Sequence, residues 1–200
     1  MPALDAARLR GAVGGRIIGR AIVVLEETTS TNDSILQMTN SVTPEGLVVF
    51  AEHQTAGRGQ RGNHWESATN KGLWFSILLR PKIEIEESAR LTAWTAETVA
   101  NTIQEQFSLT ANVKSPNDVC VDGRKVAGVL VEMRAQKNAP HLAIVGIGIN
   151  MNHAPEDFSE EIRSRVTSLA LAVNRQVNRE EFAIALLRDL DRTYCASFGL

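Results

Sequence analysis

Short apolar runs separated by polar segments recur along the chain, and this pattern predicts a series of strands. Residues 21–25 are apolar and mostly β-branched, which is typical of a buried strand. Residues 112–121 predict a short strand that is broken by a proline. Asp122-Gly123 then predicts a two-residue hairpin turn of type I′. Other runs bounded by glycine, proline or polar turns also predict strands: residues 46–52, 72–79, 125–134 and 141–150.

Three segments have the spacing or the capping residues of helices. Ser30 or Thr31 can cap a short helix that continues to about Asn40. Asn178 can cap a final helix with Glu181 as its capping-box partner. The expected buried positions of that helix are Phe182, Leu186 and Leu190. Residues 88–107 place apolar side chains at steps of four and three, as on one face of an amphipathic helix: Ala89, Ala93, Ala96, Ala100, Ile103 and Phe107.

The combination of hairpins and helices predicts the α+β class, with a mixed, largely antiparallel sheet and helices on one face. Residues 11–19 read GAVGGRIIG, and this density of glycine disfavours a rigid element before Arg20. We therefore expect residues 1–20 to form a flexible N-terminal arm and residues 21–200 to form a single domain.

Composition and charge narrow the classes of protein that fit. Hydrophobic residues make up 44% of the 200 residues and charged residues 22%, which suits a globular chain and excludes a mostly disordered one. The formal net charge of -2 argues against a dedicated nucleic-acid-binding protein, which is normally basic. Cys120 and Cys195 are too few for a disulfide framework or a zinc site. Because no membrane span or signal peptide is visible, the expected location is the reducing cytoplasm.

A long polar segment, residues 53–71, contains the string Gly57-Arg58-Gly59-Gln60-Arg61-Gly62. The string matches G-x-G-x-x-G, but a dinucleotide-binding site requires a helix that begins inside the motif, and here a strand follows. Its glycines let backbone N–H groups approach an anion, and Arg58 and Arg61 add positive charge. The segment is therefore either a phosphate- or carboxylate-binding loop or a solvated surface loop.

Other residues carry candidate chemistry that a structural role could also explain. Lys114 precedes a rigid turn, where it could supply charge to a phosphoryl transition state or simply be an exposed strand-end lysine. Asn117 and Asp118 offer oxygen ligands for Mg²⁺, although Pro-Asn-Asp is often only a turn. Gly146 and Gly148 lie inside an apolar strand, where glycine marks either the close approach of a ligand or a bulge.

The aromatic residues divide in the same way. Trp65 lies in the polar segment and is a candidate for stacking on a base or a sugar, whereas Trp74 lies within a strand and is expected in the core. The four histidines lack the spacing of metal ligands, so we assign them no metal.

Five strings follow one another along roughly residues 22–152. They are Thr29-Ser30-Thr31-Asn32, Glu52-His53-Gln54-Thr55-Ala56-Gly57-Arg58-Gly59 with Arg61-Gly62 and Trp65, Lys114-Ser115-Pro116-Asn117-Asp118, Asp122-Gly123-Arg124-Lys125-Val126-Ala127-Gly128-Val129-Leu130-Val131-Glu132, and Gly146-Ile147-Gly148-Ile149-Asn150. Each string is weak alone. In this order they resemble the catalytic domain of the biotin protein ligases, also called biotin–[acetyl-CoA-carboxylase] ligases.

The resemblance implies a fold related to class II aminoacyl-tRNA synthetases and lipoate ligases, and a reaction in two steps. The biotin carboxylate attacks the α-phosphate of MgATP, which gives biotinyl-5′-AMP and pyrophosphate. A lysine of a biotin carboxyl carrier domain then attacks the mixed anhydride. The implied small molecules are biotin, ATP and Mg²⁺, and the implied partner is the carrier domain of a biotin-dependent carboxylase. A homodimer is left open, and no specific DNA or membrane binding is expected.

The resemblance also assigns roles to residues at matching positions. The implied catalytic residues are Lys114 and Arg58. The implied biotin-binding residues are Ser30, Thr31, Asn32, Gln54, Gly57, Arg58, Gly59, Gln60, Lys114, Gly128, Gly146 and Gly148. The implied ATP-binding residues are Arg58, Arg61, Trp65, Lys114, Asn117 and Asn150. Asp118 is the candidate protein ligand for Mg²⁺ that arrives with ATP.

The chain departs from the family pattern at three places. Gln60 stands where most members carry a second arginine, so one positive charge beside the adenylate is missing. Ser115 replaces the usual tryptophan after Lys114, which loosens the expected wall of the biotin site. The sequence ends at Leu200 without the small β-barrel domain that usually follows, and its first 20 residues are too few for the helix-turn-helix domain of bifunctional members. We therefore expect an enzyme without operator binding.

Three alternative functions stay open at this point. A lipoate or octanoate ligase or transferase would share the fold, but its glycine-rich signature differs from residues 57–62. A nucleic-acid-binding module could use the loop and Trp65 for stacking, although the net charge of -2 argues against it. A non-catalytic biotin-binding relative is suggested by Gln60 and Ser115.

Overall fold

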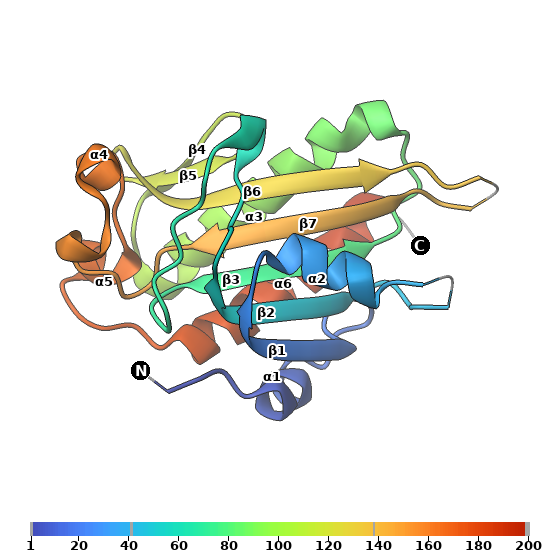
Figure 1. The fold of residues 1–200 in the computed structure, drawn as a ribbon, viewed down its shortest axis with the longest axis horizontal. Helices are drawn as coiled ribbons and strands as arrows, with labels where there is room; N and C mark the ends of the chain where they lie inside the picture. The colour runs from blue at the N-terminus through green and yellow to red at the C-terminus, as the bar shows by residue number, and fades with distance from the viewer. Residues whose placement is uncertain (1, 41, 138, 199–200) are drawn as a thin grey trace.

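The computed structural model describes residues 2–40, 42–137 and 139–198, so the expected domain end at Leu200 lies outside the described residues. Within them, seven strands form one sheet in the order β1-β2-β3-β7-β6-β5-β4 (Figure 1). The strands are β1 (Ala21–Thr28), β2 (Leu47–Gln54), β3 (Leu73–Leu79), β4 (Ala111–Lys114), β5 (Asp118–Val121), β6 (Arg124–Arg134) and β7 (Leu142–Ile149). β1 and β2 are parallel and the other neighbours are antiparallel, which confirms the predicted mixed sheet.

Two strand predictions need correction. β1 is an edge strand that pairs only with β2. Its Ile22 is buried, whereas the flanking residues are half-buried or exposed. Residues 112–121 form two strands rather than one, since the chain reverses between β4 and β5 around a cis Ser115–Pro116 peptide bond. The predicted type I′ turn is confirmed, with φ of 50° at Asp122 and 74° at Gly123.

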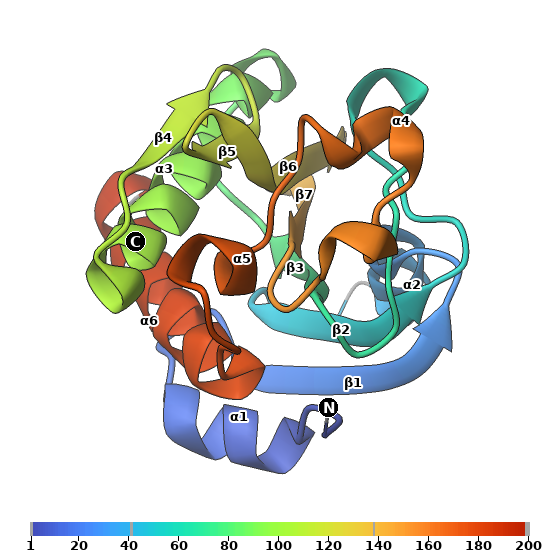
Figure 2. The ribbon, with the colours of Figure 1, turned by 90° about the vertical axis from the view of Figure 1, so that its left-hand side faces the viewer.

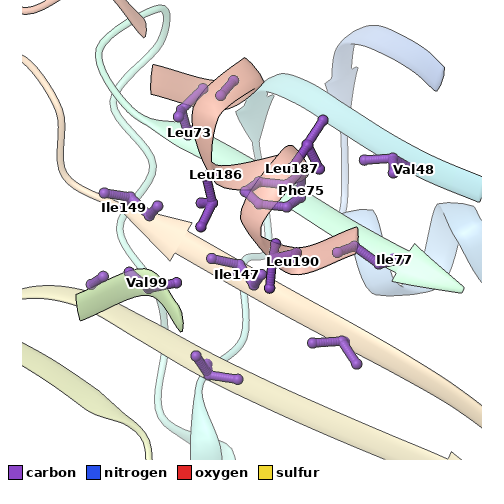
Figure 3. Close-up of a cluster of buried hydrophobic side chains, with 14 of the residues drawn as sticks. Val48, Leu73, Phe75, Ile77, Val99, Ile147, Ile149, Leu186, Leu187 and Leu190 are labelled. Atoms are coloured by element: carbon purple, nitrogen blue, oxygen red, sulfur yellow. The ribbon is translucent and has the colours of Figure 1, made fainter. Parts of the chain in front are cut away.

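Two long helices cover one face of the sheet, α3 (Ser88–Phe107) and α6 (Arg179–Phe198). Figure 2 shows both on the same side. Figure 3 shows the core between them and the sheet, where Phe75 and Ile147 meet Leu186 and Leu190. The predicted cap is confirmed, because Asn178 Oδ1 accepts hydrogen bonds from the backbone N–H groups of the second and third residues of α6, at 3.1 and 3.2 Å.

The bounds of α3 agree with the prediction, but its buried face does not. Ala89 and Ala93 are exposed, whereas Leu91, Thr95 and Val99 are buried. Threonine is tolerated there because its hydroxyl group bonds to the preceding turn, as Thr95 Oγ1 does to the Leu91 carbonyl at 2.7 Å. The spacing of the alanines therefore predicted the wrong buried face for the first half of the helix.

A third helix, α2 (Thr31–Met38), lies on the opposite face of the sheet. Its Ile35 is buried in a separate apolar cluster with Leu47, Val49, Leu78, Leu142 and Ile144. Helices therefore cover both faces, not one. The start of α2 is satisfied by Gln54 rather than by the predicted cap, because Gln54 Oε1 accepts the Thr31 N–H at 2.8 Å and Ser30 makes no side-chain cap bond.

The N-terminal segment is not a loose arm. Residues Ala6–Val13 form helix α1, with Asp5 as N-cap and Gly14 as a left-handed C-cap at φ 58°. Leu9 and Ile18 are fully buried. The carboxylate of Asp191 in α6 accepts the backbone N–H groups of residues 16, 17 and 18, each at 2.8 Å. The glycines end a helix and shape a docked turn, so the prediction of a flexible segment was wrong.

The remaining elements are short: the 3₁₀ turns η1 (Gln60–Gly62), η2 (Ile85–Glu87) and η3 (Pro155–Asp157), and the helices α4 (Glu160–Arg163) and α5 (Leu169–Val173). In the part of the chain that the structure describes, no helix has the length and apolar character needed to cross a membrane.

Candidate functional site

Glycines replace side chains at the centre of the sheet face that carries α2. Gly148 pairs with Trp74 on β3 and with Gly128 on β6, while Gly146 pairs with Ser76 and with Leu130. Residues paired across antiparallel strands point to the same face, so these positions form a shallow floor. The glycines of β7 therefore create space and do not mark a bulge.

Two side chains occupy the space above this floor. A Cβ atom added at Gly146 would lie 2.4 Å from Asn32 Oδ1, and one added at Gly148 would lie 2.6 Å from Trp65. Gly128 is restricted in the same way, because its Cβ would lie 2.8 Å from Trp65. The floor is thus shaped to receive Asn32 from α2 and Trp65 from the glycine-rich loop.

A pocket opens on this floor, and residues far apart in the sequence converge on it. Its lining residues are Ser30, Thr31, Asn32, Gln54, Arg58, Gly59, Trp65, Asn117, Lys125, Gly128, Val129, Leu130, Gly146, Ile147 and Gly148. Nine of the predicted biotin-binding residues are among them. Gly57, Gln60 and Lys114 do not line it.

One end of the pocket is a buried polar cluster. Gln54 Oε1 accepts hydrogen bonds from the Thr31 backbone N–H and from Thr31 Oγ1, at 2.8 and 3.1 Å. Ser76 Oγ lies 2.8 Å from Thr31 Oγ1 and donates to Asn32 Oδ1 at 2.5 Å. Asn32 Nδ2 donates to Glu132 at 2.6 Å. These bonds fix the orientation of the Asn32 carboxamide.

Ser76 was missed by the sequence predictions, although a signal was available. It is a fully buried hydroxyl residue within the apolar strand β3. Strand alternation places it on the same face as Trp74 and opposite to Phe75. A serine in the middle of such a strand requires a polar partner, and Asn32 supplies it.

Lys125 is the lysine that lines this pocket, and the catalytic role expected of Lys114 stays a prediction. Lys114 ends β4, is exposed and lies outside the pocket. Lys125 lies at the start of β6, close to a register shift between Val119 and Cys120. Its Nζ is 2.7 Å from Asp118 Oδ1 and 5.0 Å from the centre of the Trp65 ring. Lys125 lies within the string that begins at Asp122, but the sequence predicted no role for it.

Arg58 is bound by two carboxylates. Its Nη1 and Nη2 atoms donate to the two carboxylate oxygens of Asp33, at 2.5 and 2.8 Å, and Nη2 lies 3.4 Å from Glu132 Oε2. The hydrogen bond from Arg58 holds the pKa of Asp33 below its ordinary value.

A second, larger cavity adjoins the first and shares Trp65 and Lys125 with it. Lys114, Asp118 and Asn150 also line this cavity. Three of the predicted ATP-binding residues therefore meet here: Trp65, Lys114 and Asn150. The opposite wall comes from Phe158 to Val166, a segment to which no role was assigned from the sequence. Arg61 lines neither cavity, and Asn117 lines only the first.

An aromatic column stands between the cavities and the core. Trp65 contacts Trp74 with ring centres 5.9 Å apart, Trp74 contacts His153 at 5.6 Å, and His153 stacks on Phe158 at 5.0 Å. Trp74 is buried, as predicted. Within the described residues, the indole nitrogens of both tryptophans and both ring nitrogens of His153 are buried without a hydrogen-bond partner. Burial lowers the pKa of His153 to about 4, so its ring is neutral at pH 7.

The acidic residues of the site do not form a metal-binding cluster in the part of the chain that the structure describes. Across residues 2–40, 42–137 and 139–198, no group of three or more His, Cys, Asp or Glu side chains comes together as a metal site. Asp118 is the carboxylate nearest Lys125, at 2.7 Å, and it lines the larger cavity. A single carboxylate is compatible with Mg²⁺ that is bound mainly by phosphate groups.

Comparisons with known proteins identify the family of the chain. Residues 24–150 match the Biotin/lipoate A/B protein ligase family. The chain is 32% identical to the bifunctional ligase/repressor BirA of Bacillus subtilis over 96% of its own length, and it spans 59% of that relative. It is 30% identical to the biotin–[acetyl-CoA-carboxylase] ligase of Mycobacterium tuberculosis, covering 95% of this chain and 70% of that protein.

Solved structures show the same fold. The biotin protein ligase from Aquifex aeolicus in complex with biotin and ATP has a TM-score of 0.75 and 31% identity, with 90% of this chain and 73% of that chain covered. A lipoate protein ligase from Thermoplasma acidophilum has a TM-score of 0.64 at 15% identity, with 86% of this chain and 83% of that chain covered, a likeness in fold alone. On this evidence the chain belongs to the Biotin/lipoate A/B protein ligase family.

Proposed function

We propose that this chain activates biotin with ATP to form biotinyl-5′-AMP and transfers the biotinyl group to a lysine of a biotin carboxyl carrier domain. The observation that carries the proposal is one pocket with a buried polar cluster at one end and Lys125 at the other, which opens into a second cavity at Trp65. Relatives named as biotin ligases support it, as does the Aquifex structure with biotin and ATP.

The residues that line the pocket suit the polarity of biotin. The ureido ring has two N–H donors and a carbonyl acceptor, and it would lie against Thr31, Asn32 and Gln54. The bicycle and the valeryl chain are mostly apolar and would contact Leu130 and Ile147. The carboxylate would then point towards Lys125. A lipoyl or octanoyl group cannot form hydrogen bonds at the polar end, so that cluster disfavours the fatty-acyl alternatives.

The chemistry that follows is an in-line displacement at the α-phosphorus of ATP. A biotin carboxylate oxygen forms the new P–O bond while the bond to pyrophosphate breaks. Lys125 Nζ, which lines both cavities, would stabilise negative charge on the α-phosphoryl oxygens. Mg²⁺ carried by ATP would neutralise the phosphate charge, with Asp118 as the available carboxylate. In the second step the carrier lysine attacks the acyl carbon and AMP leaves.

The activation step is tested by biotin-dependent exchange of pyrophosphate into ATP. Lys125→Gln should reduce the exchange rate by roughly 10²–10³-fold, which is typical for loss of one transition-state charge contact. The matched variant Lys114→Gln removes an exposed lysine at the rim of the larger cavity and should have a much smaller effect. Equal losses in the two variants would contradict the assignment of Lys125.

The substrate and the partner need their own tests. Lipoic and octanoic acids should support no exchange. A carrier domain should gain one biotinyl group on one lysine when wild-type protein, biotin and ATP are present. Biotin binding without any exchange would instead identify a non-catalytic relative and would refute the proposal.

A further inference from the structure

The guanidinium group of Arg58 is held between two elements that flank the pocket. Asp33 lies on α2 and binds it in a bidentate manner, at 2.5 and 2.8 Å. Glu132 lies on β6 and approaches it at 3.4 Å. We call these three residues the clasp. Two carboxylates face one guanidinium, so the formal charge of the clasp is -1, and Arg58 offers no surplus positive charge to an anionic substrate.

The clasp fixes more than one side chain. The backbone of Arg58 forms a bridge with His64. Gly59 N donates to the Asn63 carbonyl at 2.7 Å, and Trp65 N donates to the Gly57 carbonyl at 2.9 Å. These bonds make residues 57–65 a hairpin. Holding Arg58 therefore holds the hairpin that places Trp65 over the glycine floor.

Glu132 connects the clasp to the polar end of the pocket. Its Oε2 atom accepts the hydrogen bond from Asn32 Nδ2 at 2.6 Å and also faces Arg58. Asn32 Oδ1 is held by Ser76 on the other side. The same carboxylate thus orients the carboxamide expected at the ureido ring and braces the loop expected at the carboxylate and phosphate groups.

We propose that Asp33 and Glu132 are positioning residues that hold the hairpin of residues 57–65 over the pocket through Arg58. The inference rests on the proposed function. Arg58 then has a structural role as the centre of the clasp. The positive charge that faces the substrate anion comes from Lys125 and from the positive ends of backbone N–H groups.

The direction in which Asp33→Asn changes KM for biotin separates this role from direct anion binding by Arg58. Asp33→Asn removes the ion pair with Arg58 and so weakens the clasp. KM for biotin should then rise about three- to fivefold, the modest effect expected of a partly exposed ion pair. If Arg58 bound the substrate anion, the same change would release it and lower KM. Arg58→Gln should raise KM to a similar extent, and the double variant should be no worse than Arg58→Gln alone, because both changes remove one contact. Additive effects or a lower KM in Asp33→Asn would overturn the proposal.

Hydrogen exchange measures how firmly the clasp holds the hairpin of residues 57–65, and it does so independently of ligase activity. In the ligand-free protein, Asp33→Asn should speed exchange about three- to fivefold at the amides of Gly59 and Trp65, which the hairpin bonds protect. Glu132→Gln should have the same direction of effect. Glu87→Gln is the matched control, because Glu87 pairs with Arg90 at 2.6 Å on the exposed surface. Unchanged hydrogen exchange in Asp33→Asn would contradict the positioning role of the clasp. Absence of biotin-dependent pyrophosphate exchange in wild type would instead count only against the proposed function.

Discussion

Gln60 opens the 3₁₀ turn η1, half-buried, beside the exposed Arg61. The resemblance to the biotin protein ligases implies an arginine at this position, so this chain presents a neutral amide where a charged contact to the adenylate is expected. Arg61 has a left-handed backbone with φ of 58° and lines neither cavity. The neighbouring charge therefore does not replace the missing one in the ligand-free structure.

Gln60→Arg should slow the release of biotinyl-5′-AMP. A hydrogen bond to a charged group is worth roughly 1.5–3 kcal/mol, which corresponds to about a ten- to hundredfold change in affinity. Wild type should accordingly label unrelated lysines more than Gln60→Arg does. The measurement is the dissociation rate of the preformed adenylate from each protein. Equal rates would mean that Arg61 swings into the site when the ligand is bound, and the idea of a leaky site would be abandoned.

At the scale of elements, local signals predicted most of the fold. The strands, the bounds of α3 and the Asp122-Gly123 turn follow from spacing and turn chemistry, which operate over a few residues. The errors concern tertiary contacts. The glycines before Arg20 indicated flexibility, but Asp191 binds that segment from a distant helix. Lys114 and Lys125 could not be ranked from the sequence, because only the folded sheet shows that Lys125 lines both cavities and Lys114 only the larger one.

Asn32 of α2 fits closely against Gly146 of β7, and a substitution of this glycine tests the fit. In Gly146→Ala the new Cβ would lie 2.4 Å from Asn32 Oδ1, and Asn32 is already held at both ends of its carboxamide. Overpacking of this kind typically costs about 1–3 kcal/mol in the free energy of unfolding. We also expect the dissociation constant for biotin to rise about tenfold, as for the loss of one well-placed polar contact.

The control for this substitution is Gly11→Ala. Gly11 lies within α1, and an added Cβ would meet nothing within 4 Å. Replacement of a helical glycine by alanine should raise the free energy of unfolding by about 0.5–1 kcal/mol and leave biotin binding unchanged. Urea unfolding and calorimetric titration with biotin measure both quantities. Normal biotin affinity in Gly146→Ala would contradict the fitted floor.

At the scale of the whole molecule, the sheet gathers five distant strings onto one face. The helices α3 and α6 cover the other face and form the main core together with the strands. The face that carries α2 can therefore hold groups that a core would reject, such as the carboxylates of Asp33 and Glu132 and buried ring nitrogens without a hydrogen-bond partner. The aromatic column on this face holds four such buried nitrogens within the described residues, from Trp65, Trp74 and His153. Only the His153 ring among these groups titrates near neutral pH, so its burial makes the stability of the chain depend on pH.

His153 gives this dependence a direction. It is 2% exposed, and its pKa falls to about 4 in the folded chain from an ordinary value of 6.5. Above pH 6.5 the ring is neutral in both the folded and unfolded states, so the stability contributed by its neutral burial is fully present. As the pH falls from 6.5 to 4 only the unfolded state binds the proton, so the free energy of unfolding decreases by up to about 1.4 kcal/mol per pH unit. The total loss is about 3 kcal/mol.

His153→Phe should remove this part of the pH dependence, because phenylalanine can stack on Phe158 and contact Trp74 without binding a proton. Asp157 and Asp33 also have lowered pKa values and lose stabilisation in acid, so the informative quantity is the difference between variant and wild type. Urea unfolding between pH 4 and pH 8 should show this difference growing as the pH falls below 6.5. The variant His64→Gln, which changes an exposed histidine, should follow wild type. If His153→Phe and wild type lose stability in parallel, then water or a ligand reaches the ring nitrogens, and His153 is not held neutral by burial.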